Sequence, residues 1–95
     1  MQFSAELREG VASGRITLTF RLWSRAQVKE GGRYAVAGAQ IEIDSIEMVP
    51  FSSVTKADVR RCGEKGLESL RARTAHAGPV RDDTLVYRIE FHVVD

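Results

Sequence analysis

A strict alternation of apolar and polar residues over positions 15–23 constrains this chain more than any other feature of its sequence. Side chains that alternate with a period of two point to opposite faces of a β-strand, and a helix cannot sort them in this way. The two threonines of the segment are β-branched and suit a pleated strand. We therefore predict a strand whose apolar face holds Ile16, Leu18, Phe20 and Leu22, and whose polar face holds Arg15, Thr17, Thr19, Arg21 and Trp23.

Three further segments have the pattern of strands. Residues 1–3 predict a short first strand, and residues 34–36 form a brief alternating run after a Gly-Gly pair. Residues 85–94 alternate almost completely, which predicts a long closing strand. The inward face of that strand is expected to hold Leu85, Tyr87, Ile89, Phe91 and Val93.

The segment 40–51 has an apolar pattern that changes phase. Ile41 and Ile43 share one phase and Ile46 and Met48 share the other, so one extra residue lies between them. A β-bulge near Asp44 or Ser45 explains the change, because it bends a strand and keeps both apolar sets toward the core.

Short helices are predicted between the strands. Ser4 is a good N-cap for a helix that ends at Gly14, and Thr55 with Asp58 resembles a capping box for a helix that Gly63 stops. Helical spacing continues over residues 67–75. These elements predict an α+β fold: a small mixed or antiparallel β-barrel of about five to six strands with two to three short helices, whose closure would remove exposed strand edges.

Length and composition indicate one ordinary globular domain spanning residues 1–95. Apolar residues make up 43% and charged residues 28% of the chain, and the net charge of +1 neither favours nor excludes nucleic acid as a partner. No stretch has the pattern of a signal peptide or a membrane span, so we expect a cytoplasmic protein, as a monomer or weak dimer. The single cysteine, Cys62, lacks zinc-ligand spacing, and no metal or cofactor is expected.

The segment from Ala12 to Arg21 resembles the signature of the ASCH family, a PUA-like group with the pattern Gly-x-Lys followed by four residues and Arg. Gly14 and Arg21 match this pattern, and the order of the other predicted elements is similar over nearly the whole chain. The resemblance implies a barrel fold and RNA binding in a cleft beside the signature strand. Some members are small hydrolases that deacetylate N4-acetylcytidine or cleave RNA.

The resemblance to the hydrolase branch implies a catalytic Lys, Thr and Glu. The Thr corresponds to Thr19 and the Glu to Glu64, but the Lys position is Ile16. An alkyl side chain can neither take a proton nor attack a carbonyl group, so that mechanism lacks its base or nucleophile. Arg15 does not replace the lysine. Its guanidinium stays protonated, and as the strand neighbour of Ile16 it points to the opposite face from the Lys position.

The polar face of the signature strand is the candidate binding site. Guanidinium groups bind phosphate, hydroxyls add single hydrogen bonds, and an indole stacks on a base. Lys29 and Arg33 would extend this surface for a phosphate backbone. The structural alternative is that the face is the solvated side of a strand, and that Trp23 caps the core. The basic residues around positions 60–73 predict a solvated helix face.

Three functional hypotheses follow from these residues. The first is a non-catalytic module that binds RNA or a nucleotide through Arg15, Thr17, Thr19, Arg21, Trp23, Lys29 and Arg33. The second is a hydrolase that acts on a modified nucleoside or on RNA with Thr19 and Glu64. The third is a protein-interaction module, which an exposed apolar patch without a basic cleft would favour.

Overall fold

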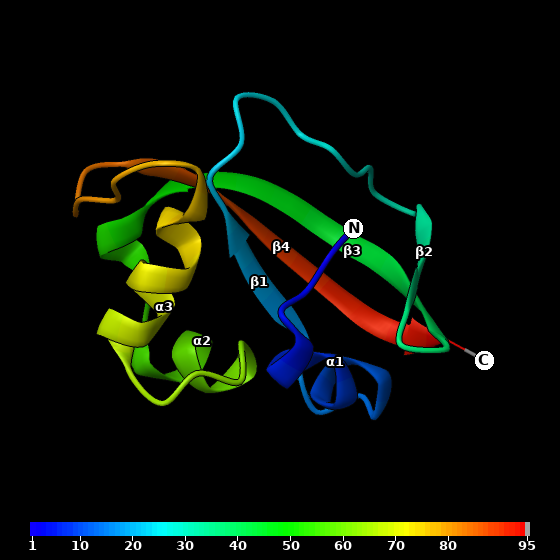
Figure 1. The fold of residues 1–95 in the computed structure, drawn as a ribbon. Coiled ribbons are helices and arrows are strands. Elements are labelled where there is room, and N and C mark those ends of the chain that lie inside the picture. Colours follow the sequence, from blue (N-terminus) through cyan, green and yellow to red (C-terminus); the bar gives the residue numbers. More distant parts are fainter. Residues whose placement is uncertain (95) are drawn as a thin grey trace.

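The computed structural model describes residues 1–94 as a four-stranded antiparallel sheet with three short α-helices (Figure 1). The α+β class predicted from the sequence is confirmed. No helix within these residues has the length and apolar character needed to cross a bilayer. In chain order the elements are α1 (Ala5–Ala12), β1 (Leu18–Arg21), β2 (Arg33–Val36), β3 (Ala39–Pro50), the 3-10 helix η1 (Phe51–Ser53), α2 (Lys56–Arg61), α3 (Leu67–Thr74), the 3-10 helix η2 (Ala75–Ala77) and β4 (Leu85–Val94).

The sheet is open, and the predicted barrel of five to six strands is not found in residues 1–94. The strand order is β1-β4-β3-β2, so β1 and β2 form the two edges and do not pair with each other. Residues 1–3 do not form the expected extra strand. The reason is packing: Phe3 is buried with its ring centre 5.6 Å from that of Phe91, so this segment covers a face of the sheet instead of extending it.

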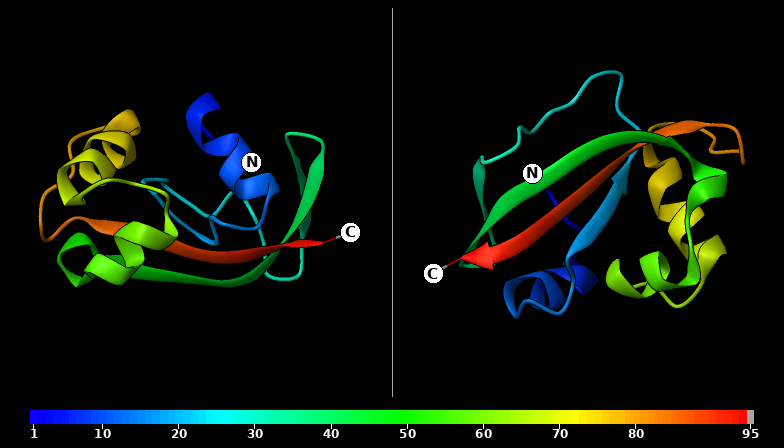
Figure 2. Two further views of the ribbon diagram at one scale, coloured as in Figure 1. Left: turned by 90° about the horizontal axis from the view of Figure 1, so that it is seen from below. Right: turned by 180° about the vertical axis from the view of Figure 1, so that it is seen from behind.

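The bulge predicted in the long strand is confirmed. Ile43 pairs with Phe91 and Ser45 pairs with Glu90, which leaves Asp44 as the extra residue. Because of this extra residue, Ile41, Ile43 and Ile46 all contribute to one apolar cluster on the same face of the sheet. Met48, which was expected to face the core with Ile46, is instead 48% exposed. In Figure 2, β3 curves strongly along its length and wraps the sheet toward the helices.

The predicted signature strand is shorter than its alternation suggests. Only Leu18–Arg21 forms β1, paired with β4. Before it, the amide of Ile16 donates to the carbonyl of Gly10, and the amide of Thr17 donates to the carbonyl of Arg61. The amides of Ile16 and Thr17 therefore bond to α1 and to the end of α2, while the Thr17 carbonyl still accepts from the Phe91 amide of β4.

The predicted helices are found with small changes in their ends. In α2, Thr55 Oγ1 accepts from the Asp58 amide and the Asp58 carboxylate accepts from the Thr55 amide, which confirms the capping box. In α1, Ser4 is the N-cap residue but its side chain makes no capping bond.

The sequence predicted that Leu85 of the closing strand faces the core. In the structure Leu85 is 54% exposed, and Val86 on the opposite face is buried instead.

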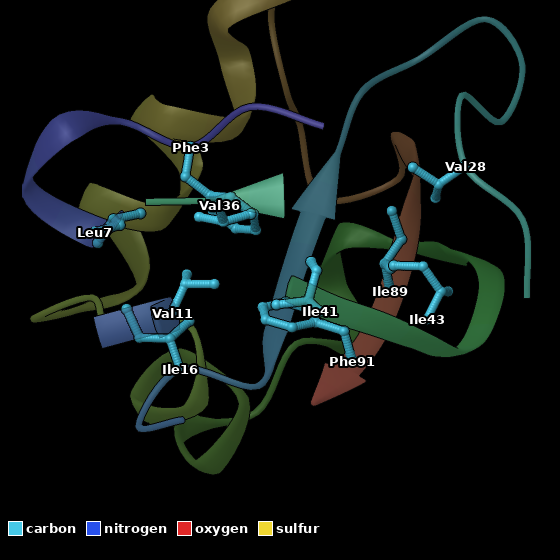
Figure 3. Close-up of a cluster of buried hydrophobic side chains, with 10 residues drawn as sticks. All are labelled: Phe3, Leu7, Val11, Ile16, Val28, Val36, Ile41, Ile43, Ile89 and Phe91. Atoms are coloured by element: carbon cyan, nitrogen blue, oxygen red, sulfur yellow. The ribbon is translucent and has the colours of Figure 1, made fainter. Parts of the chain in front are cut away.

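Two buried apolar clusters hold the helices against the sheet. One lies between α1 and the sheet and includes Phe3, Val11, Ile41, Ile89 and Phe91 (Figure 3). The other joins β1 to α2, α3 and the start of β4. Both α1 and α3 stand on the same side of the β3–β4 ribbon in Figure 2, with the edge strand β1 between them in Figure 1. The candidate site lies there.

Candidate functional site

A cleft of about 510 Å³ lies beside the edge strand β1. Its walls come from the N-terminal segment with α1, from β1 and the residues after it, and from α3 with η2. Three of the candidate residues on the signature strand line it, together with Glu64. The residues around the cleft are Gln2, Phe3, Ser4, Leu7, Thr19, Phe20, Arg21, Leu22, Trp23, Cys62, Glu64, Leu70, Ala72, Arg73, Thr74, His76 and Ala77.

Arg21 is the central polar group of this wall. Its Nε donates to Thr19 Oγ1 at 3.0 Å, and its Nη2 donates to the carbonyl oxygen of Gln2 at 2.6 Å. Its guanidinium carbon lies 4.8 Å from the ring centre of Phe3 and 5.9 Å from that of Trp23. Burial lowers the pKa of Arg21 to about 10, so the group keeps its charge at neutral pH. Within residues 1–94 no carboxylate pairs with it.

Trp23 lies at the end of the same wall. Its ring is half-buried and packs against the ring of Tyr87, with 6.0 Å between ring centres and a tilt of 46°. This contact holds the indole in place while part of it remains open to solvent. A held, partly exposed aromatic ring is the arrangement that stacks on a planar ligand.

The second guanidinium of the cleft, Arg73 of α3, is neutralised by acidic partners. Its Nε pairs with Glu64, whose side chain is only 5% exposed, and its Nη2 pairs with Glu6 of α1 at 2.6 Å. Hydrogen bonds to Glu64 and then Glu6 outweigh desolvation and raise the pKa of Arg73. The three side chains therefore connect α1, the loop after α2, and α3 around the cleft.

Thr17, one of the predicted ligand-binding residues, belongs to a different polar network. Its Oγ1 accepts from Nε of Arg61, whose Nη2 pairs with Glu90 at 2.8 Å. Glu90 also pairs with Arg88, which in turn pairs with Asp58 of α2. None of these side chains lines the cleft.

The other predicted ligand-binding residues lie away from the cleft. Arg15 is exposed and lies beside Gly10 of α1. Lys29 is exposed in the loop before β2, and Arg33 pairs with Glu42 across the β2–β3 hairpin at 3.1 Å. The structure thus brings together Thr19, Arg21, Trp23 and Glu64, and it separates Arg15, Thr17, Lys29 and Arg33 from them.

Ile16, which stands at the family's Lys position, is part of the core. Its side chain is 1% exposed and lies close to the backbones of Gly10 and Gly63. A Cβ atom built on Gly63 would lie 2.5 Å from Ile16 Cδ1, so any larger residue there requires the Ile16 side chain to shift. The Ile16 side chain is therefore packed in the core and does not line the cleft.

The prediction that the basic helix residues are all solvated is wrong for Arg71, whose guanidinium carbon lies 4.6 Å from the ring centre of Phe51, and for Arg73. Arg73 lines the cleft, as do His76 and Gln2, which sequence reasoning did not select. No local pattern marks them, because they reach the cleft only through the packing of α3 and the N-terminal segment.

Cys62 is buried in the wall of the cleft. Burial raises the pKa of its thiol to about 12, and the nearby carboxylates of Asp58 and Glu64 add to this effect. Such a thiol is not a nucleophile at neutral pH.

One group of side chains in the described residues has the spacing of metal ligands. Ligand atoms of Glu42, Asp44 and His92 lie within 4.8 Å of one another, outside the cleft. Glu42 already pairs with Arg33, and Asp44 lies 2.7 Å from His92 Nδ1. Contacts between protein groups account for this cluster.

The fold and cleft define an α+β domain in which an edge strand carries a partly buried arginine. No family model matches the sequence, and no curated protein sequence matches it either. Among solved structures, an ASCH domain from Lactobacillus crispatus is similar, with a TM-score of 0.78 and 18% identity over 98% of this chain and 77% of that chain. A DUF984 protein from Enterococcus faecalis has a TM-score of 0.69 and 21% identity over 95% and 71%. The chain has an ASCH-like fold.

Proposed function

We propose that this chain binds RNA or a nucleotide in the cleft beside β1, with Arg21 as the anion-binding group. The observation that carries the proposal is the state of Arg21: a partly buried cation that faces the cleft and has no carboxylate partner within residues 1–94. A cation in this state gains most from an anion that enters the cleft. The ASCH-like fold supports the same function, since the resemblance implies RNA binding beside this strand.

The remaining groups of the cleft suit the other parts of a nucleotide. Trp23 offers a ring for stacking, and Thr19 fixes the orientation of the Arg21 fork. Arg73 contributes less to anion binding because Glu64 and Glu6 already neutralise it. We therefore expect a single dominant phosphate contact and a base-stacking contact, rather than a long basic track.

Fluorescence anisotropy with short labelled RNA at low salt tests this function. We expect binding that weakens as salt rises, and a loss of about tenfold or more for Arg21→Ala. Arg60→Ala removes the same charge from an exposed position on α2 outside the cleft and should bind as the parent protein does. Thermal unfolding of each variant checks that the fold survives. Absence of binding at low salt would refute the proposal.

A hydrolase is the second candidate, because Thr19 and Glu64 line the same cleft. Against it stand the burial of Ile16 at the Lys position and the pairing of Glu64 with Arg73. Incubation with N4-acetylcytidine and with labelled RNA decides between the two. Turnover that is lost in Glu64→Gln and Thr19→Val would establish this second function, while turnover that survives both would place the active site elsewhere.

A further inference from the structure

A second hollow adjoins the cleft and shares part of its wall. It has a volume of about 350 Å³. Three residues, Gln2, Arg21 and Trp23, line both spaces, so the guanidinium and the indole stand where the two hollows meet. The residues around the second hollow are Met1, Gln2, Arg21, Trp23, Gln27 and Val28.

The chemistry of the second hollow differs from that of the cleft. The cleft contains the Glu64 carboxylate and two guanidinium groups, whereas Arg21 is the one charged side chain that residues 1–94 place around the second hollow. Gln2 and Gln27 bring primary amides, each of which both donates and accepts hydrogen bonds. Val28 and Trp23 bring apolar and aromatic surface. Amides beside an aromatic ring recognise a neutral, planar heterocycle with donors and acceptors on its edge, which describes a nucleobase.

Arg21 is placed to bind the link between two such groups. The hydrogen bonds described for residues 1–94 engage its Nε and Nη2, which leaves Nη1 for a ligand. A phosphodiester carries one negative charge and joins two nucleosides. A guanidinium at the junction of two hollows therefore lies where a nucleoside in each hollow would place the phosphate between them.

We infer that the cleft and the second hollow are adjacent subsites for two consecutive nucleotides of single-stranded RNA, with the linking phosphate on Arg21. This inference rests on the proposed function and makes it more specific. A mononucleotide would fill only one subsite, so the minimal ligand that uses the whole surface is a dinucleotide. Gln27 lines the second hollow but not the cleft, so a substitution of Gln27 tests the second subsite.

Isothermal titration calorimetry with the common nucleoside monophosphates and with ribodinucleotides tests the two-subsite arrangement. We expect the best dinucleotide to bind about tenfold or more tighter than its component mononucleotides, because a second base is bound in the second hollow. An abasic dinucleotide that lacks either base should lose this gain. Gln27→Ala should reduce dinucleotide affinity and leave mononucleotide affinity unchanged, and Gln40→Ala, an exposed glutamine of β3 outside both hollows, should change neither.

The possible results distinguish the two-subsite inference from the proposed nucleotide binding on which it rests. If mononucleotides bind but dinucleotides bind no tighter, the second subsite is refuted and nucleotide binding stands. If dinucleotides bind tighter and Gln27→Ala retains the gain, the second hollow is not the subsite and the inference fails. If no nucleotide binds, both proposals fall. Circular dichroism of each variant ensures that a lost gain reflects the ligand site and not unfolding.

Discussion

Nε of Arg21 donates a hydrogen bond to Oγ1 of Thr19, 3.0 Å away and two residues earlier on β1. Both side chains point to the same face of the strand, as a period of two requires. Thr19 itself is buried. The threonine therefore acts on the cleft through the arginine, whose guanidinium it orients between Phe3 and Trp23.

Thr19→Val should test this positioning role, because valine keeps the shape and removes the hydroxyl. We expect the free energy of unfolding to fall by about 1 kcal/mol, the net value of one such bond, as measured by urea denaturation. The same variant should weaken nucleotide binding less than Arg21→Ala does. Equal losses for the two variants would instead indicate that Thr19 contacts the ligand directly.

Glu64→Gln should destabilise the protein and improve anion binding at the same time. The substitution removes the buried partner of Arg73 and leaves that guanidinium with Glu6 alone, so we expect a loss of about 1–3 kcal/mol in unfolding free energy. It also deletes a negative charge from the cleft, so nucleotide affinity should rise. Glu68→Gln, on the exposed side of α3, is the matched control. A sharp fall in affinity for Glu64→Gln would contradict the assignment of Arg21 as the dominant anion contact.

Acid should destabilise the fold through Asp58 and Glu90. Burial alone would raise the pKa of the Asp58 carboxyl, but hydrogen bonds from Thr55 and Arg88 outweigh it and hold that pKa below its usual value. The hydrogen bond from Arg61 lowers the pKa of Glu90 in the same way. A depressed folded pKa means that this stabilisation is complete above the unfolded values of about 4 and is lost as the pH falls through the folded values.

Asp58→Asn should therefore flatten the pH dependence of stability below about pH 4, measured by thermal or urea unfolding across the acid range. At pH 7 the variant should be less stable by about 1 kcal/mol, since it weakens the capping box and the pair with Arg88. Asp83→Asn, in an exposed turn, should keep the slope of the parent protein. An unchanged slope in Asp58→Asn would show that the acid response arises elsewhere.

Gly63→Ala should be among the most costly single-methyl additions in this chain. Gly63 has φ +76°, which alanine resists, and the added methyl would meet Ile16 Cδ1. We expect a loss of about 2 kcal/mol or more, against about 1 kcal/mol for Gly38→Ala. Gly38 has φ +83° with no atom within 4 Å of an added Cβ, so it isolates the backbone cost. Combining Gly63→Ala with Ile16→Val should cost less than the sum of the two single changes, and strict additivity would rule out the clash.

Local chemistry allowed several elements to be predicted from the sequence. The capping box of Thr55 and Asp58 depends on residues three apart, and the phase change around Asp44 directly counts the residues of the bulge. The alternation around Leu18 and Phe20 identified the edge strand and put Thr19 and Arg21 on one face. Each of these signals acts over a few neighbouring residues, so it is visible without knowledge of the fold.

Only the tertiary structure decided which polar groups share a cleft. Thr17 and Thr19 have the same place in the alternating pattern, yet Thr17 accepts from Arg61 while Thr19 supports Arg21. Glu6 and Arg73 are 67 positions apart and meet through the packing of α1 and α3 beside β1. Phe3 likewise packs against Phe91, so residues 1–3 cover the sheet instead of forming the expected strand. Contacts between distant residues depend on how whole elements pack, and no local period records that.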